Sequence, residues 1–163
     1  MPSFDVEAAL NGLKALVETI PSMEAVRIGA PESLTNRIEA WITVGDPGGI
    51  GTAGDTTTTN TPVVQGVYDL DINLILWFGY SVEGAESAAE AQLADWLSSI
   101  TRALIQNRMG TVGAVTRNLN GSVDRMGLPT AAAGISDYTL MAGAEVRTFP
   151  IGIRIVQREA LGV

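Results

Sequence analysis

The sequence contains no cysteine and no histidine, and Lys14 is its only lysine. Without cysteine there is no disulfide and no thiolate catalysis, and without histidine the commonest general base and metal ligand are missing. Ser–His and Cys–His catalysis are therefore excluded. The longest apolar run, residues 74–78, is far shorter than the roughly 20 residues of a membrane-spanning helix. We expect no membrane span, no signal peptide, and a location in a cytosol or in a particle built there.

Positive charge is also scarce, and it is unevenly distributed. The formal net charge is −8, with ten acidic and three basic residues in 1–81 but eight acidic and seven basic residues in 82–163. An acidic chain is not expected to hold a polyphosphate by its general field, because such binding depends on Lys and Arg. The two halves could instead pair between identical copies, or their charges could lie on ordinary solvated faces.

The apolar pattern predicts two helices and several strands in one domain that spans residues 1–163. Ser3 is the expected cap of a first helix that ends at Pro21 and buries a stripe at spacings of three and four. A second helix is expected over 83–107. Strands are expected over 24–29, 37–44, 63–80, 138–147 and 148–158, with a possible short strand at 111–116 and a turn at 120–121. The predicted fold is α+β, a mainly antiparallel sheet with both helices on one face.

Alternation within the strands predicts which residues face the core. In the strand over 63–80 the even-numbered residues 68–80 are expected inward, and Asp69, Asp71 and Trp77 outward. In the strand over 37–44, Trp41 is expected outward and Val44 inward. In the last strand, Arg154 and Arg158 are expected outward.

Residues 45–62 form the most unusual segment, with five glycines, six threonines and no lysine, arginine or glutamate. Such a segment cannot build a core, and loops this long are usually functional or disordered. We expect a mobile hairpin arm that becomes ordered against a neighbour. Its glycines superficially resemble a phosphate loop, but the Gly-Lys-Ser/Thr of a Walker motif is absent.

Several residues are candidates for a site. Asp69 and Asp71, with Asp46 and Asp55, could bind a divalent cation, although a solvated sheet face is favoured; replacing Asp69 and Asp71 by Asn would then cost less than about 1 kcal/mol. The tryptophans could anchor an interface or close a core on both sheet faces. An arginine cluster over 102–125 favours contact with a partner over nucleic acid. The expected interface residues are Trp41, Gly48, Ile50, Thr57, Asp69, Asp71, Trp77, Arg102, Arg108, Arg117, Arg154 and Arg158. We expect no catalytic residue, cofactor or metal.

The size, the order of elements, the arm between two strands, the long helix after the third strand and the closing strand 149–156 together resemble one family. Over residues 4–158 the chain resembles the tail-terminator proteins of long-tailed bacteriophages (tail completion, minor tail protein U class). That resemblance implies a virion protein, assembled in the host cytoplasm, that forms a homohexameric ring on the tail tube. It implies that the ring ends tube polymerisation, joins the tail to the head connector and lets genomic DNA pass without specific binding.

Two other classes stay open at this point. One is a different ring or adaptor protein of a phage neck or a related contractile device. The other is a small metal-dependent enzyme that uses Asp69, Asp71 and acids of the arm.

Overall fold

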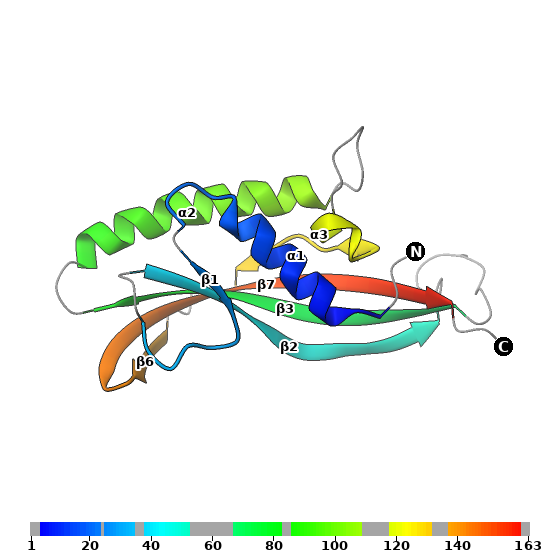
Figure 1. Ribbon diagram of the computed structural model, residues 1–163, viewed down its shortest axis with the longest axis horizontal. Helices are drawn as coiled ribbons and strands as arrows, with labels where there is room; N and C mark the ends of the chain where they lie inside the picture. The colour runs from blue at the N-terminus through cyan, green and yellow to red at the C-terminus, as the bar shows by residue number, and fades with distance from the viewer. Residues whose placement is uncertain are drawn as a thin grey trace.

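The computed structural model describes residues 4–23, 25–34, 38–52, 67–82, 86–108, 118–131 and 137–160. The fold is α+β, as predicted, with a seven-stranded, mostly antiparallel sheet and α1 and α2 packed on one of its faces (Figure 1). The elements follow in the order α1 (Val6–Glu18), β1 (Val26–Ile28), β2 (Ile38–Thr52), β3 (Val67–Ser81), α2 (Glu86–Asn107), α3 (Asn118–Gly121), β4 (Arg125–Met126), β5 (Thr130–Ala131), β6 (Asp137–Met141) and β7 (Ala144–Ala160).

Three long strands form the middle of the sheet, in the order β1-β2-β3-β7-β4. β3 and β7 pair without interruption from Val67↔Ala160 to Ser81↔Val146. β4, β5 and β6 pair one after another with the other side of β7. The pair β1–β2 is parallel, whereas the other pairs are antiparallel. The longest uninterrupted ladder, β3–β7, thus joins two strands that are far apart in the sequence.

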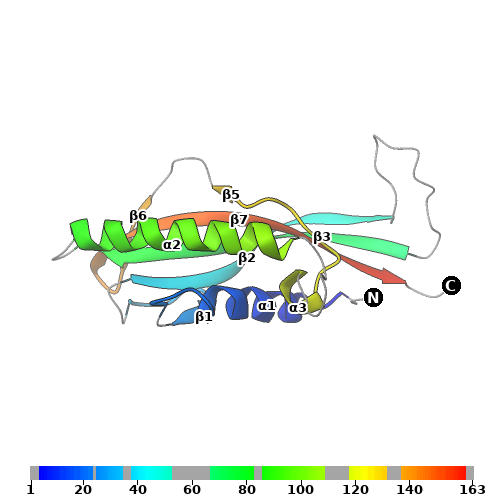
Figure 2. The same cartoon turned by 90° about the horizontal axis from the view of Figure 1, so that it is seen from above.

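β2 extends eight residues further than the sequence predicts. Residues 45–52, which were predicted only as the first part of a hairpin arm over 45–62, are strand and pair with β3 as far as Thr52↔Tyr68. The pairing shifts on both sides of Pro47, because proline has no N–H to donate to a ladder. Residues 53–62 lie outside the described part of the chain. The far ends of β2, β3 and β7 reach beyond the helices (Figure 2).

The core lies between the helices and one sheet face, where the predicted stripes are buried. Residues 72, 74, 76, 78 and 80 of β3 are all buried, as a period of two requires. The cap of α1 is Asp5, and not Ser3, because its carboxylate accepts a hydrogen bond from the N–H of Ala8 at 2.9 Å. Val44 was expected to be buried but is 50% exposed, since it lies on β2 just past the end of β1.

A tight hairpin at Ala142–Gly143 joins β6 to β7, so the predicted division between strands at residue 147 is wrong. Both residues have positive φ, 49° and 81°, which suits the two-residue turns that match strand twist. β7 therefore runs for 17 residues as one strand. Pro150 falls between the residues paired with β6 and those paired with β5, a position that tolerates a missing N–H.

α3 is a left-handed turn. Asn118, Leu119, Asn120 and Gly121 have φ of 54°, 54°, 60° and 78°, a region that costs an L-residue about 1–2 kcal/mol. Leu119 is buried, and its N–H donates to Oδ1 of Asn107 at 2.7 Å. A Cβ added to Gly12 of α1 would lie 2.4 Å from the carbonyl oxygen of Leu119. A turn was predicted at 120–121, and the predicted strand over 111–116 lies outside the described residues.

Candidate interaction face

The sheet face opposite the helices brings together six of the twelve predicted interface residues. We call it the second face. Because side chains alternate along a strand, the residues that face away from the core of β3 lie here, as do those of β2 and β7 that pair with them. One end of the second face is charged and the other is aromatic. The residues of this face include Arg27, Glu39, Trp41, Thr43, Asp69, Asp71, Trp77, Gly79, Arg125, Thr148, Pro150, Arg154 and Arg158.

At the charged end, Asp69 binds two arginines. Its carboxylate accepts hydrogen bonds from Nε and Nη2 of Arg158 at 2.7 and 3.0 Å, and from Nη2 of Arg125 at 2.9 Å. Arg158 lies directly across the β3–β7 ladder and Arg125 comes from β4. The Arg158 hydrogen bond is the largest of the effects that hold the pKa of Asp69 below its usual value, against a smaller opposing effect of burial.

A second pair lies two residues further along β3. Asp71 accepts from Nε of Arg154 at 2.9 and 2.8 Å, and also binds its Nη2. This is the fork-like geometry in which guanidinium binds carboxylate best. The side chains of Asp69 and Asp71 are only 14% and 20% exposed. The prediction that they form a solvated face is therefore wrong, because cross-strand arginines cover them.

At the aromatic end, Trp41 and Trp77 face each other across β2 and β3 with ring centroids 6.3 Å apart and planes 7° apart. The indole N–H of Trp77 donates to Oγ1 of Thr43 at 2.9 Å. Trp77 is partly exposed, as an interface residue would be. Trp41 is only 2% exposed, so the expectation of an exposed tryptophan is wrong for Trp41. Its ring lies over Gly79, where an added Cβ would approach it to 2.6 Å.

Glu39, which alternation along the strand over 37–44 places on the outward face with Trp41, extends this end of the second face. It is 1% exposed and lies 3.5 Å from Nε of Arg27. Since a buried carboxylate needs compensation, Arg27 covers a charge that the strand pattern placed in water. The aromatic end of the second face thus also carries an ion pair, between Arg27 and Glu39.

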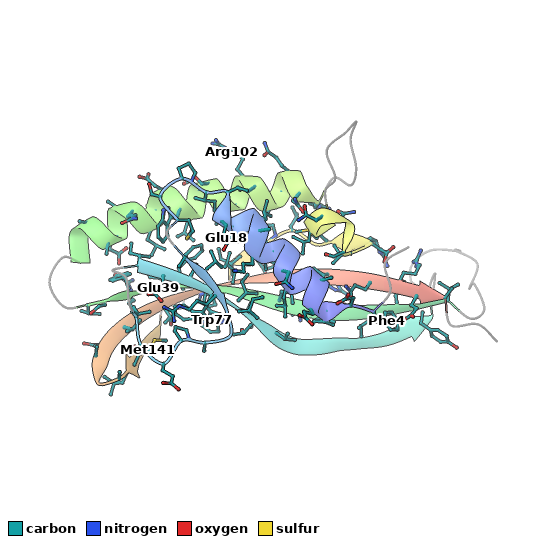
Figure 3. The ribbon with its side chains drawn as sticks, in the orientation of Figure 1. Phe4, Glu18, Glu39, Trp77, Arg102 and Met141 are labelled. Carbon is teal, nitrogen blue, oxygen red and sulfur yellow. The ribbon has the colours of Figure 1, made fainter. Side chains whose placement is uncertain are left out.

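The three described arginines of the cluster predicted over residues 102–125 do not share one surface. Arg125 lies on the second face, whereas Arg102 is exposed on α2 and points away from the sheet (Figure 3). Arg108, just after α2, is also exposed. Thr57 and Arg117 lie outside the described residues, and Gly48 and Ile50 lie in β2 with only their backbone described.

Two side-chain clusters of the sheet, one on each of its faces, were not predicted from the sequence. The role of Arg125 as partner of Asp69 depends on β4 pairing with β7, and β4 has only two residues. On the helix side, Arg147 binds both Glu90 and the hydroxyl of Tyr80, which itself donates to Glu90. The guanidinium of Arg147 lies 4.8 Å from the ring centre of Phe149. This cluster attaches the first half of α2 to the sheet.

The acids proposed for a cation site are not assembled by the part of the chain that can be described. Asp69 and Asp71 bind guanidinium groups, only the backbone of Asp46 is described, and Asp55 lies outside. Among the described residues no three acidic side chains gather as metal ligands. Of the described helices, none has the length and apolar character to cross a membrane.

Comparison with known proteins gives no relative from which a role could be transferred. The chain matches no model of a protein family, and no curated protein sequence matches it.

Proposed function

We propose that this protein is a structural component of a phage particle, without enzymatic activity, that forms a ring at the end of a tail tube. There it ends tube polymerisation and joins the tail to the head. The proposal is supported by the observed element order, in which one helix precedes three strands and a long helix follows them. This is the architecture on which the resemblance to tail terminators depends.

The observation that carries the proposal is the pairing of arginines on the second face. Arg125, Arg154 and Arg158 each bind a carboxylate of β3, and Arg27 lies against Glu39. A guanidinium that already has a carboxylate partner gains little by exchanging it for a phosphate, so this face offers a polyanion little attraction. A wide sheet face on which each of these arginines already has a carboxylate partner suits a surface along which DNA passes without binding.

A ring must also make contact with neighbours, and two features support this. β2, β3 and β7 extend beyond the helices (Figure 2), so their ends are available to another subunit or to the tube. Trp77 is partly exposed on the second face, and tryptophan is enriched among the residues that anchor interfaces.

Sedimentation velocity over a range of protein concentrations, combined with negative-stain electron microscopy, tests the ring. The expected result is a species several times heavier than the 17.1 kDa chain, visible as rings with a central hole. A strict monomer at every concentration and salt would refute the ring. Labelling phage particles with an antibody against the protein would show where it lies. A label at the junction of tail and head supports the proposal, whereas a label in another part of the neck supports an adaptor protein.

A double variant tests whether the ion pairs of the second face keep DNA from binding. Asp69→Asn with Asp71→Asn leaves Arg125, Arg154 and Arg158 without carboxylate partners, so duplex DNA should bind more tightly and with a steeper salt dependence. Glu7→Gln with Glu18→Gln is the matched control, because it changes the net charge equally at exposed positions of α1, on the other side of the sheet. Equal DNA binding by both double variants would show that the pairing is irrelevant.

A further inference from the structure

The outer side of α2 carries two opposite charges without partners. Asp95 and Arg102 are exposed and lie seven residues apart, which is two turns, so both point to the same side of the helix. Among the described residues neither forms an ion pair, whereas five other arginines each bind a carboxylate. Figure 3 shows Arg102 directed away from the sheet.

The helix surface around these charges allows close approach. Ala91, Ala94, Ser98 and Thr101 are all exposed on the outer side of α2, and small side chains let two helix backbones come near each other. The charges of α2 are also separated along its length. Glu86, Glu90 and Asp95 lie in its first half, Arg102 lies in its second half, and Arg108 comes just after its end. Two such helices attract each other when they run antiparallel.

A hollow lies beside the first half of α2. It has a volume of about 370 Å³ and is lined by Pro21, Ser22, Ala91, Gln92, Asp95, Trp96 and Ser99. Trp96 is buried, and its indole N–H has no hydrogen-bond partner. One turn after Arg102, Ile105 is 44% exposed, an aliphatic side chain without cover near the other end of the same helix.

We propose that two copies of this chain pack α2 against α2, antiparallel, about a two-fold axis between Ser98 and Ser99. This axis places Asp95 of one copy beside Arg102 of the other, so this ion pair forms twice. It also places Ile105 of each copy against the small, exposed side chain of Ala91 of the other. One geometry thus uses the unpaired charges, the exposed isoleucine and the small residues of the outer side together.

This contact goes beyond the proposed ring and does not depend on it. A two-fold contact uses the same patch on both copies and is complete with two, whereas ring closure needs two different patches on each copy. If rings form, the α2 contact would join copies from two rings. If they do not, it would give a dimer.

Charge exchange tests the geometry. Asp95→Arg and Arg102→Asp, each alone, place like charges opposite each other twice, so we expect each to weaken dimerisation at least about tenfold in sedimentation velocity at low salt. An equimolar mixture of the two variants should recover the dimer, because one chain then carries two arginines and the other two aspartates. Ile105→Ala should weaken the wild-type dimer as well.

Circular dichroism establishes that each variant is folded, and Glu7→Arg on α1 is the matched control for a charge reversal elsewhere. The proposal is overturned if folded single variants associate like the wild type, or if their mixture does not recover. It is also overturned if the wild type shows no two-fold association. Rings are scored separately by microscopy. Rings in the wild type together with unchanged two-fold association of the folded single variants would refute this contact alone, and rings absent from a wild type that dimerises through α2 would refute the ring alone.

Discussion

Replacing Asp69 by Asn should destabilise the protein far more than its position on an outward strand face suggests. The change removes the charged acceptor of three hydrogen bonds from two arginines. Hydrogen bonds to charged groups contribute about 1.5–3 kcal/mol each when shielded, but Arg125 is 57% exposed and Arg158 34%, so water and salt reduce the gain. We expect a loss of about 2 kcal/mol, which corresponds to about 4–8 °C in Tm for a domain of this size.

Urea unfolding followed by tryptophan fluorescence measures this loss. Asp71→Asn is the matched control on the same strand, because Asp71 binds a single arginine that is 67% exposed, and it should cost less than about 1 kcal/mol. The pH dependence gives a second test. Because the folded pKa of Asp69 lies below the ordinary value of 3.8 for an aspartate, its contribution to stability is complete above that pH and is lost as the pH falls through the folded pKa. Equal, small losses in both variants, with identical acid profiles, would refute the reasoning.

Three further substitutions test the packing at two glycines and the pKa of Tyr80. Gly12→Ala places a methyl group against the backbone oxygen of Leu119, which cannot rotate away, so a loss of about 2 kcal/mol or more is expected in urea unfolding. Gly79→Ala should change the near-UV circular dichroism and cost about 1–3 kcal/mol, because its methyl group meets the ring of Trp41. Burial, followed by the hydrogen bond to a carboxylate, raises the pKa of Tyr80 above 10.0. Its contribution is complete below the unfolded pKa and is lost as the pH rises through the folded pKa, so Tyr80→Phe should flatten the alkaline loss of stability above about pH 10.

The orientation of the strand residues was predictable from the sequence. Of the residues predicted inward on β3, residues 72, 74, 76, 78 and 80 are buried, as are residues 151, 153 and 155 of β7, because a period of two needs only local information. Tyr68 and Leu70, at the start of β3, are only partly buried. Strand ends were less predictable. Residues 45–52 lack an apolar pattern, yet they continue β2 because β3 offers them a ladder. Main-chain pairing of that kind leaves no trace in composition.

Exposure on the second face was not predictable, because it depends on which residues are neighbours across strands. Trp41 faces the second face, as alternation requires, but Gly79 leaves the space in which its ring is buried. Leu119 is a similar case. Its left-handed backbone is compatible with the fold because Gly12, about a hundred residues earlier, has no side chain.

The distribution of charge along the sequence was a poor guide to where two copies of the chain would bind each other. The acidic first half and the more basic second half suggested attraction between copies, yet the β3–β7 register brings these halves together within one chain. It places Asp69 opposite Arg158, and Asp71 also binds an arginine of β7. Charges that neutralise each other in this way cannot also hold a neighbour strongly. Those on α2 remain, since Asp95 and Arg102 have no partner among the described residues. A search for contacts between copies should therefore begin at α2, where the chain leaves opposite charges unpaired, and treat the arginines of β7 as part of the fold.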